Sequence, residues 1–188
     1  MLNNLRSLGI GGCDLLTVLP DEIGQLSRLQ SLMLLDLRLE RLPSTMGELQ
    51  HLSELFIYQS CRLRSLPPSI LDLTELQYLN FGGLSEKQIC DFFVPGCNNL
   101  HKSLESVVMH NCNLGEGEGL SKVWSFLLHC PKLEHIDLRE NRIASLKAFL
   151  LTSPSGGTEE DTRPGKPSRL RFLDLRDNPI DEDPEDLK

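Results

Sequence analysis

The feature that most constrains this chain is an apolar pattern, L-x-x-L-x-L, that recurs along almost its whole length. Each occurrence carries apolar residues at its first, fourth and sixth positions, as in Leu29, Leu32 and Leu34. The occurrences begin at Leu5, Leu29, Leu52, Leu76, Leu104, Leu133 and Leu170. Repetition of this kind indicates a solenoid, in which each repeat buries little alone and successive repeats share one core.

The chain must turn three residues after the third apolar position of each repeat. The residues found there are Cys13, Leu37, Ser60, Leu84, Cys112, Asn141 and Asn178. A buried turn leaves backbone groups without partners, which an Asn amide can satisfy fully and a Cys thiol weakly. We expect the Asn and Cys residues to take this role, which Leu37 and Leu84 cannot.

The spacing of the repeats divides the chain into two parts. The first four repeats start 24, 23 and 24 residues apart. Leu-Pro pairs occur at 19–20, 42–43 and 66–67, and they are followed by Ile23, Met46 and Ile70. This pattern resembles the leucine-rich-repeat family, in the short class found in plant resistance proteins and Ras-pathway scaffolds. The last three repeats start 28, 29 and 37 residues after their predecessors and resemble the longer ribonuclease-inhibitor class.

The resemblance implies an α/β solenoid over residues 1–188, with about seven repeats in a single domain. A curved parallel β-sheet would line the concave side, and helices or irregular turns would cover the convex side. Helical spacing predicts that one helix packs an apolar face on the sheet. Its residues are Leu120, Val123, Trp124, Leu127 and Leu128.

Three stretches fall outside the regular repeat. Residues 152–169 are rich in Ser, Thr, Gly and Pro, which predicts a flexible insert whose hydroxyls are candidate phosphorylation sites. Residues 181–188 form an acidic tail, interpreted as a solvated end. The first repeat begins almost at Met1, so we expect either a fragment of a longer protein or an end that another segment or a partner covers.

Composition argues against several classes of protein. The net charge of −8 gives little reason to expect nucleic acid or an anionic membrane surface as a partner. No stretch approaches the ~18 apolar residues of a membrane span, so membrane insertion is not expected. The six cysteines occur singly, which favours reduced thiols and a cytoplasmic location.

The sequence lacks the signatures of catalysis. It has no G-x-S-x-G nucleophile motif, and the GEGEG at 115–119 lacks the Lys of a phosphate-binding loop. His129, Cys130 and His135 superficially suggest metal ligands, but the repeat register separates them. We therefore predict no catalytic residues, no metal and no small-molecule cofactor.

With the register of the repeats fixed by the buried apolar positions, the third, fifth, seventh and eighth positions of each repeat are expected to be exposed on the concave face. In repeats two to four these positions carry Met33, Leu35, Phe56, Tyr58 and Tyr78, with Asn80 beside them. Adjacent strands lie ~4.8 Å apart, so these side chains would touch. The patch is interpreted either as a binding surface or as side chains that merely cover one another.

The later repeats present charges on the same face. Asp137 and Asp174 share position five, Arg139 and Arg176 share position seven, and Glu140 and Asp177 share position eight. His110 and His135 occupy positions seven and three of their own repeats. The charges are interpreted either as a mutually neutralising lattice or as a contact surface for a charged partner.

Together these features predict a non-enzymatic protein-interaction module of intracellular signalling or recognition. The candidate partner-binding residues are Met33, Leu35, Phe56, Tyr58, Tyr78, Asn80, His110, His135, Asp137, Arg139, Asp174 and Arg176. One alternative is the substrate-recognition or autoinhibitory repeat region of a larger enzyme or resistance-type receptor. A purely structural scaffold is another.

Overall fold

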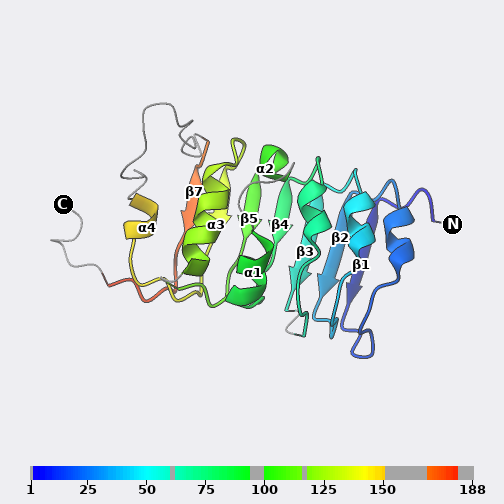
Figure 1. Ribbon diagram of the computed structural model, residues 1–188, viewed down its shortest axis with the longest axis horizontal. Helices are drawn as coiled ribbons and strands as arrows, with labels where there is room; N and C mark the ends of the chain where they lie inside the picture. Colours follow the sequence, from blue (N-terminus) through cyan, green and yellow to red (C-terminus); the bar gives the residue numbers. More distant parts are fainter. Residues whose placement is uncertain (1, 60–61, 94–99, 116–117, 151–168, 182–188) are drawn as a thin grey trace.

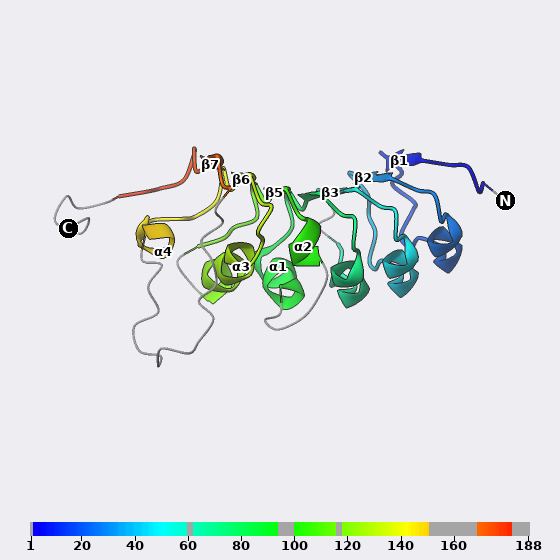
Figure 2. The same ribbon diagram turned by 90° about the horizontal axis from the view of Figure 1, so that it is seen from above.

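Two layers make up the part of the chain that the computed structural model describes, which is residues 2–59, 62–93, 100–115, 118–150 and 169–181. Parallel strands form one sheet in chain order, and helices cover one face of it (Figures 1 and 2). The strands are β1 (Ser7–Gly11), β2 (Ser31–Leu35), β3 (Glu54–Tyr58), β4 (Tyr78–Asn80), β5 (Ser106–Val108), β6 (His135–Asp137) and β7 (Phe172–Asp174). The strands follow a shallow arc with the helices on its outer side, which confirms the predicted α/β solenoid.

The convex layer changes character along the chain. The Leu-Pro segments form short 3-10 helices, η1 (Asp21–Gln25), η2 (Ser44–Glu48) and η3 (Pro68–Asp72). The fourth repeat, which the sequence groups with the short repeats, holds α1 (Glu86–Phe92) and α2 (Leu100–Ser103), while the fifth holds α3 (Glu118–Leu128) and the sixth α4 (Lys147–Leu150). Pro20, Pro43 and Pro67 stand at the N-caps of the 3-10 helices with φ of −69°, −71° and −68°. The proline ring fixes this value of φ, so each Leu-Pro pair sets where the convex turn begins.

Every strand begins two residues after the first leucine of its repeat, and the strands pair in that register from β1 to β7. The three apolar positions are fully buried in the inner repeats, as in Leu52, Leu55 and Ile57. In the first repeat they are only partly buried, because β1 has a neighbour on one side alone. The predicted core face of α3 is buried, except that Leu128 is half-exposed.

Asparagine side chains hold the turns of the last repeats together. The Asn141 Oδ1 accepts the backbone N–H of Cys112 and of Leu114, both at 3.0 Å. Its Nδ2 donates to the carbonyls of Met109 at 2.9 Å and Leu138 at 2.8 Å. The Asn178 Nδ2 repeats this pattern on Leu138. Buried turns therefore have their backbone partners supplied by side chains, as the sequence predicts.

The prediction that Asn and Cys side chains satisfy buried turns is wrong for Cys13, in the first repeat. Cys13 is exposed, and its Sγ donates only to the carbonyl of Gly11, at 3.4 Å. No earlier repeat packs over the turn of the first repeat in the structure, so that turn is not buried. Cys112 does behave as expected, because its buried Sγ donates to the Phe81 carbonyl at 3.1 Å. Leu37 and Leu84 are buried at the same position and supply apolar contact instead.

The eighth position of each repeat belongs to the turn rather than to the strand face, which corrects the sequence-based assignment. Its φ is positive in every repeat: Gly12 62°, Asp36 49°, Gln59 53°, Gly83 78°, Asn111 53°, Glu140 54° and Asp177 58°. The backbone N–H of this residue donates to the position-seven carbonyl of the next repeat, as from Asp36 to Tyr58 at 3.0 Å. Side chains at this position therefore line the rim of the concave face.

The flexible insert predicted at 152–169 and the acidic tail predicted at 181–188 lie outside the described residues, apart from Arg169 and Asp181. The candidate phosphorylation sites of the insert also lie outside them. Among the described helices, none is long and apolar enough to cross a membrane.

Replacing Asn141 by Ala should lower the free energy of unfolding by about 2–4 kcal/mol, because it leaves several buried backbone groups without partners. Denaturant titration followed by circular dichroism measures this loss. Asn3→Ala, at an exposed position near the N-terminus, serves as the matched control and should change stability little. Equal stability of the two variants would contradict the structural role of Asn141.

Candidate functional site

The concave face of β2, β3 and β4 carries the apolar and aromatic side chains that the sequence predicts there. We call Met33, Leu35, Phe56, Tyr58 and Tyr78 the aromatic patch. Met33 pairs with Phe56 and Leu35 with Tyr58 in the strand register. The rings of Phe56 and Tyr78 lie 4.9 Å apart with an interplanar angle of 31°. Leu35 is 38% exposed and the other four are half-buried, so the side chains cover one another in part and still form a continuous surface.

A glycine extends this surface towards β5. Gly82 occupies the seventh position between Tyr58 and His110, and it has no side chain to separate them. The Tyr58 and His110 rings close over it, with centroids 5.4 Å apart. A Cβ added at Gly82 would lie 2.7 Å from His110 Nε2 and 2.9 Å from Tyr58 Cδ2. His110 therefore joins the aromatic patch from two strands away, and its buried Nδ1 has no hydrogen-bond partner among the described residues.

Three of the predicted site residues have a local structural task. The side chains of Asn80, Asp137 and Asp174, at the fifth position, accept the backbone N–H two residues further on at 2.9, 3.1 and 3.2 Å. In the same repeats the strand ends at this residue, whereas β1, β2 and β3 continue for two residues more. These side chains cap the short strands, as Asn and Asp do in turns.

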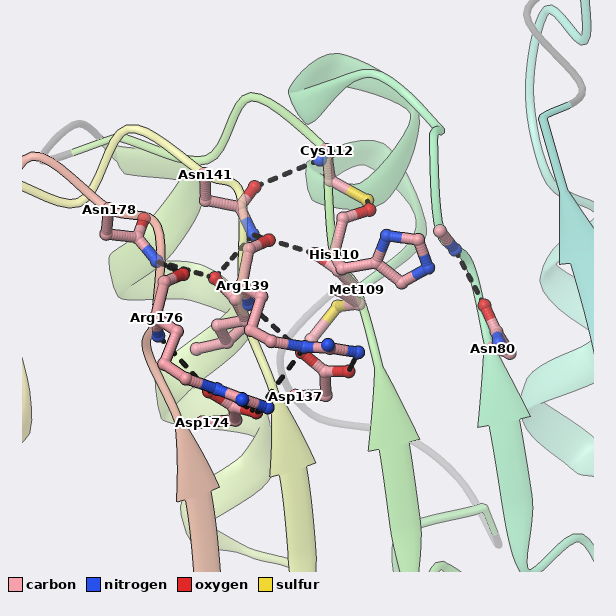
Figure 3. Close-up of polar contacts among 12 residues, drawn as sticks. Asn80, Met109, His110, Cys112, Asp137, Arg139, Asn141, Asp174, Arg176 and Asn178 are labelled. Carbon is pink, nitrogen blue, oxygen red and sulfur yellow. Dashed lines mark hydrogen bonds and ion pairs between the residues drawn. The ribbon is translucent and has the colours of Figure 1, made fainter.

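The charges of the last repeats neutralise one another (Figure 3). Arg139 donates to both carboxylate oxygens of Asp137, at 2.9 and 2.7 Å, and its Nε lies 3.4 Å from Asp174. Arg176 donates to Asp174 at 2.9 and 2.6 Å. The Asp174 side chain is 4% exposed, while 69% of the Arg176 side chain is exposed. Ion pairs therefore link Asp137, Asp174, Arg139 and Arg176, and the Arg176 side chain stays open to solvent.

These contacts change the acidity of both carboxyl groups. The hydrogen bond from Arg176 is the largest influence on Asp174 and holds its pKa below the ordinary value, although burial acts in the opposite direction. Burial also acts to raise the pKa of Asp137, but hydrogen bonds from the side chain and backbone of Arg139 outweigh it, and the pKa is lowered.

His135 lies apart from the aromatic patch. It is exposed on β6, and its ring centroid is 6.1 Å from that of Phe172 on β7. Sequence reasoning left Phe172 out of the site, although it occupies position three and is 49% exposed. Glu54 and Val108 were left out as well, and they also face the concave side, paired with Tyr78 and Asn80. The same positional rule, applied to every strand, would have found all three.

Groups suited to catalysis or metal binding do not converge in the described residues. Burial raises the pKa of the Cys112 and Cys130 thiols to about 12, so both are protonated at neutral pH and are poor nucleophiles. His129 Nδ1 lies 2.7 Å from the Ser125 carbonyl, and His135 lies on the concave face. Within the described part of the chain, no three His, Cys, Asp or Glu side chains form a group that could hold a metal ion.

A cavity of about 360 Å³ opens at the turn edge beside α1. Its lining includes two cations, Arg64 and Lys87. Both are paired with carboxylates, Arg64 with Glu40 at 3.3 Å and Lys87 with Asp91 at 2.5 Å. The cavity therefore offers little free positive charge to attract an anionic cofactor.

A sheet of in-register parallel strands, backed by Leu-Pro turns and short helices, defines a leucine-rich-repeat protein. Family comparison agrees: residues 1–147 match the model described as "Leucine-rich repeat region", and residues 169–188 match "Leucine Rich Repeat". The chain belongs to the leucine-rich-repeat family. Such domains typically serve as protein-interaction modules and are usually non-catalytic, and no catalytic family was identified.

Solved structures show the same fold. The leucine-rich repeat domain of the type III effector XopL is 25% identical, with a TM-score of 0.52, and the match covers 77% of this chain and 52% of that one. A leucine-rich-repeat protein of Leptospira interrogans is 22% identical with a TM-score of 0.50, over 99% of this chain and 58% of that one. This chain thus spans just over half the length of these structures. A search of curated proteins found no match.

Acid should selectively weaken the contribution of Asp174. Because its pKa is lowered in the folded state, the ionised group stabilises the protein above the ordinary Asp pKa of ~3.9, and this stabilisation is lost as pH falls through the folded-state pKa. Wild type should therefore exceed Asp174→Asn in free energy of unfolding at pH 7, and the difference should shrink below pH ~4.

Denaturant titrations of both proteins at several pH values measure this difference. Asp72→Asn, which alters an exposed carboxylate on η3, is the control for charge removal alone. A difference between wild type and Asp174→Asn that stays constant with pH would contradict the ion-pair role of Asp174.

Proposed function

We propose that this chain is a non-catalytic module of intracellular signalling or recognition that binds a polypeptide partner on its concave face. The single observation that carries the proposal is the aromatic patch, extended by His110, which the repeat itself does not require. The repeat demands apolar residues only at the buried positions of each strand, so the aromatic rings that face outward are surplus to the core. Aromatic side chains in a continuous surface dominate the energetics of many interfaces.

The charged lattice has a secondary role in this proposal. Asp137 and Asp174 are occupied by strand capping and by ion pairs, so they orient Arg139 and Arg176 rather than contacting a partner themselves. Arg176 then offers an exposed cation at the end of the concave face, which would favour one orientation of the partner over the reverse.

A cytoplasmic location is part of the proposal. Cys13, Cys112 and Cys130 are free thiols in the structure, and free thiols are typical of a reducing compartment. Cys61 and Cys97 lie outside the described residues.

A second candidate is the recognition region of a larger protein, such as a ubiquitin ligase or a resistance-type receptor. It is favoured by the XopL match, which is itself one domain of an effector and extends well beyond the matched part. Sequencing of full-length transcripts distinguishes the two, because a catalytic or nucleotide-binding domain in the same reading frame would support the second candidate.

The test of the proposal is a pull-down from cell lysate with wild type beside Phe56→Ala/Tyr58→Ala, after circular dichroism shows that both are folded. Loss of the two rings should weaken capture of the partner at least about tenfold. Gly82→Ala should also weaken it, because the added Cβ forces Tyr58 and His110 apart. Phe172→Ala removes an exposed ring from β7, outside the patch, and is the matched control.

If the double variant and wild type recover the same partners with equal yield, the concave patch is not the binding site. If Phe172→Ala loses the partner and the double variant keeps it, the binding surface lies over the last repeats instead.

A further inference from the structure

The concave surface around the aromatic patch has a one-sided charge. At positions three, five, seven and eight of the repeats that contain β2, β3 and β4, the charged residues are Glu54 and Asp36, and these described positions hold no Lys or Arg. Both carboxylates are exposed, and neither forms an ion pair with a described residue. This differs from the last repeats, where each carboxylate on the strands is paired with an arginine.

The two carboxylates stand at opposite ends of the patch. Glu54 lies at the start of β3, where it pairs with Tyr78 in the register. Asp36 follows β2 directly and lies at the rim, next to Leu35. Position three and position seven, the last strand position before Asp36, are four residues apart, which is ~13 Å along a strand. The side chains of the aromatic patch lie between Glu54 and Asp36.

The pKa of Tyr78 responds chiefly to burial and in smaller part to nearby carboxylates. Its pKa is raised, first because the ring is partly buried and also because the negative charges of Asp137 and Glu54 oppose ionisation of the phenol. The hydrogen bond with Asn80 acts in the opposite direction. Glu54, the one of these two carboxylates without an arginine partner among the described residues, therefore lies close enough to act on the ring that packs against Phe56.

We propose that the segment bound on the concave face of β2, β3 and β4 is basic as well as apolar: an extended stretch of polypeptide in which an aromatic or aliphatic side chain is flanked by Lys or Arg. This inference rests on the proposed function, and it adds the chemistry of the partner. The apolar side chain packs on Phe56 and Tyr58, while the cations approach Glu54 and Asp36.

Physical reasons favour this chemistry over its alternatives. A cation bound at Glu54 would also come close to the rings of Phe56 and Tyr78, and aromatic rings attract cations. An acidic segment would meet like charge at both ends of the patch and no compensating cation on these strands. Nucleic acid would meet the same repulsion along its phosphates.

The test begins with selection from a random linear-peptide display library on the immobilised full chain. Bound peptides should be enriched in Lys and Arg beside aromatic or aliphatic residues. One selected peptide is then synthesised twice, once as selected and once with its basic residues replaced by Gln. Dissociation constants are measured for wild type and for the variants Glu54→Gln, Asp36→Asn and Phe56→Ala/Tyr58→Ala.

The basic peptide should bind Glu54→Gln and Asp36→Asn about two- to fivefold more weakly than wild type, with a smaller difference at high salt. The Gln peptide should bind these variants and wild type equally, since the charge coupling is gone. Glu22→Gln, which alters an exposed carboxylate on η1, is the control and should leave both affinities unchanged.

The outcomes separate the two proposals. Selected peptides that need Phe56 and Tyr58 but carry no basic residues, or a basic peptide whose affinity Glu54→Gln and Asp36→Asn leave unchanged, would overturn the basic-partner inference and leave the proposed function standing. If no selected peptide depends on Phe56 and Tyr58, the proposed function fails and the inference falls with it.

Discussion

The structure depends on the stacking of leucines from one repeat onto those of the next. A single repeat cannot bury its own apolar side chains, so Leu52, Leu55 and Ile57 are buried only because repeats on both sides cover them. This stacking holds the strands in one register from β1 to β7. The side chains of Asn141 and Asn178 then close the turns of the last repeats, where the backbone would otherwise lack partners. The core thus holds the outward-facing side chains in fixed rows.

The proposed function depends on which side chains the strands present on the concave face. A parallel sheet sets its strands ~4.8 Å apart, so residues at one position of successive repeats become neighbours regardless of their distance in sequence. In repeats two to four the rows hold aromatic and aliphatic side chains bordered by Glu54 and Asp36, and in the last repeats they hold paired Asp and Arg. One scaffold therefore presents an apolar, negatively bordered surface beside a neutralised one.

The sequence predicts which side chains face the concave side, but it does not predict every contact that they form. The outward direction of Phe56, Tyr58 and Tyr78 follows from the alternation of a strand, because the buried leucines fix the opposite face. The contact of Tyr58 with His110 was missed. It forms because Gly82, which lies between the two rings, has no side chain to separate them. The strand-capping role of Asn80 and Asp137 was missed, because the repeat pattern predicts the face of the sheet on which a side chain lies and not the hydrogen bonds that it forms. The exposure of Cys13 depends on the neighbours of β1, which the repeat pattern does not specify.

Hydroxyl-radical footprinting of the protein with and without a selected peptide tests the central claim most directly, because it reports the solvent exposure of individual side chains. If the concave patch is the binding surface, oxidation of Phe56, Tyr58 and Tyr78 falls when the peptide is bound, while oxidation of Phe172 on β7 does not change. Protection confined to the convex helices or to the last repeats, with the patch as exposed as before, would contradict it.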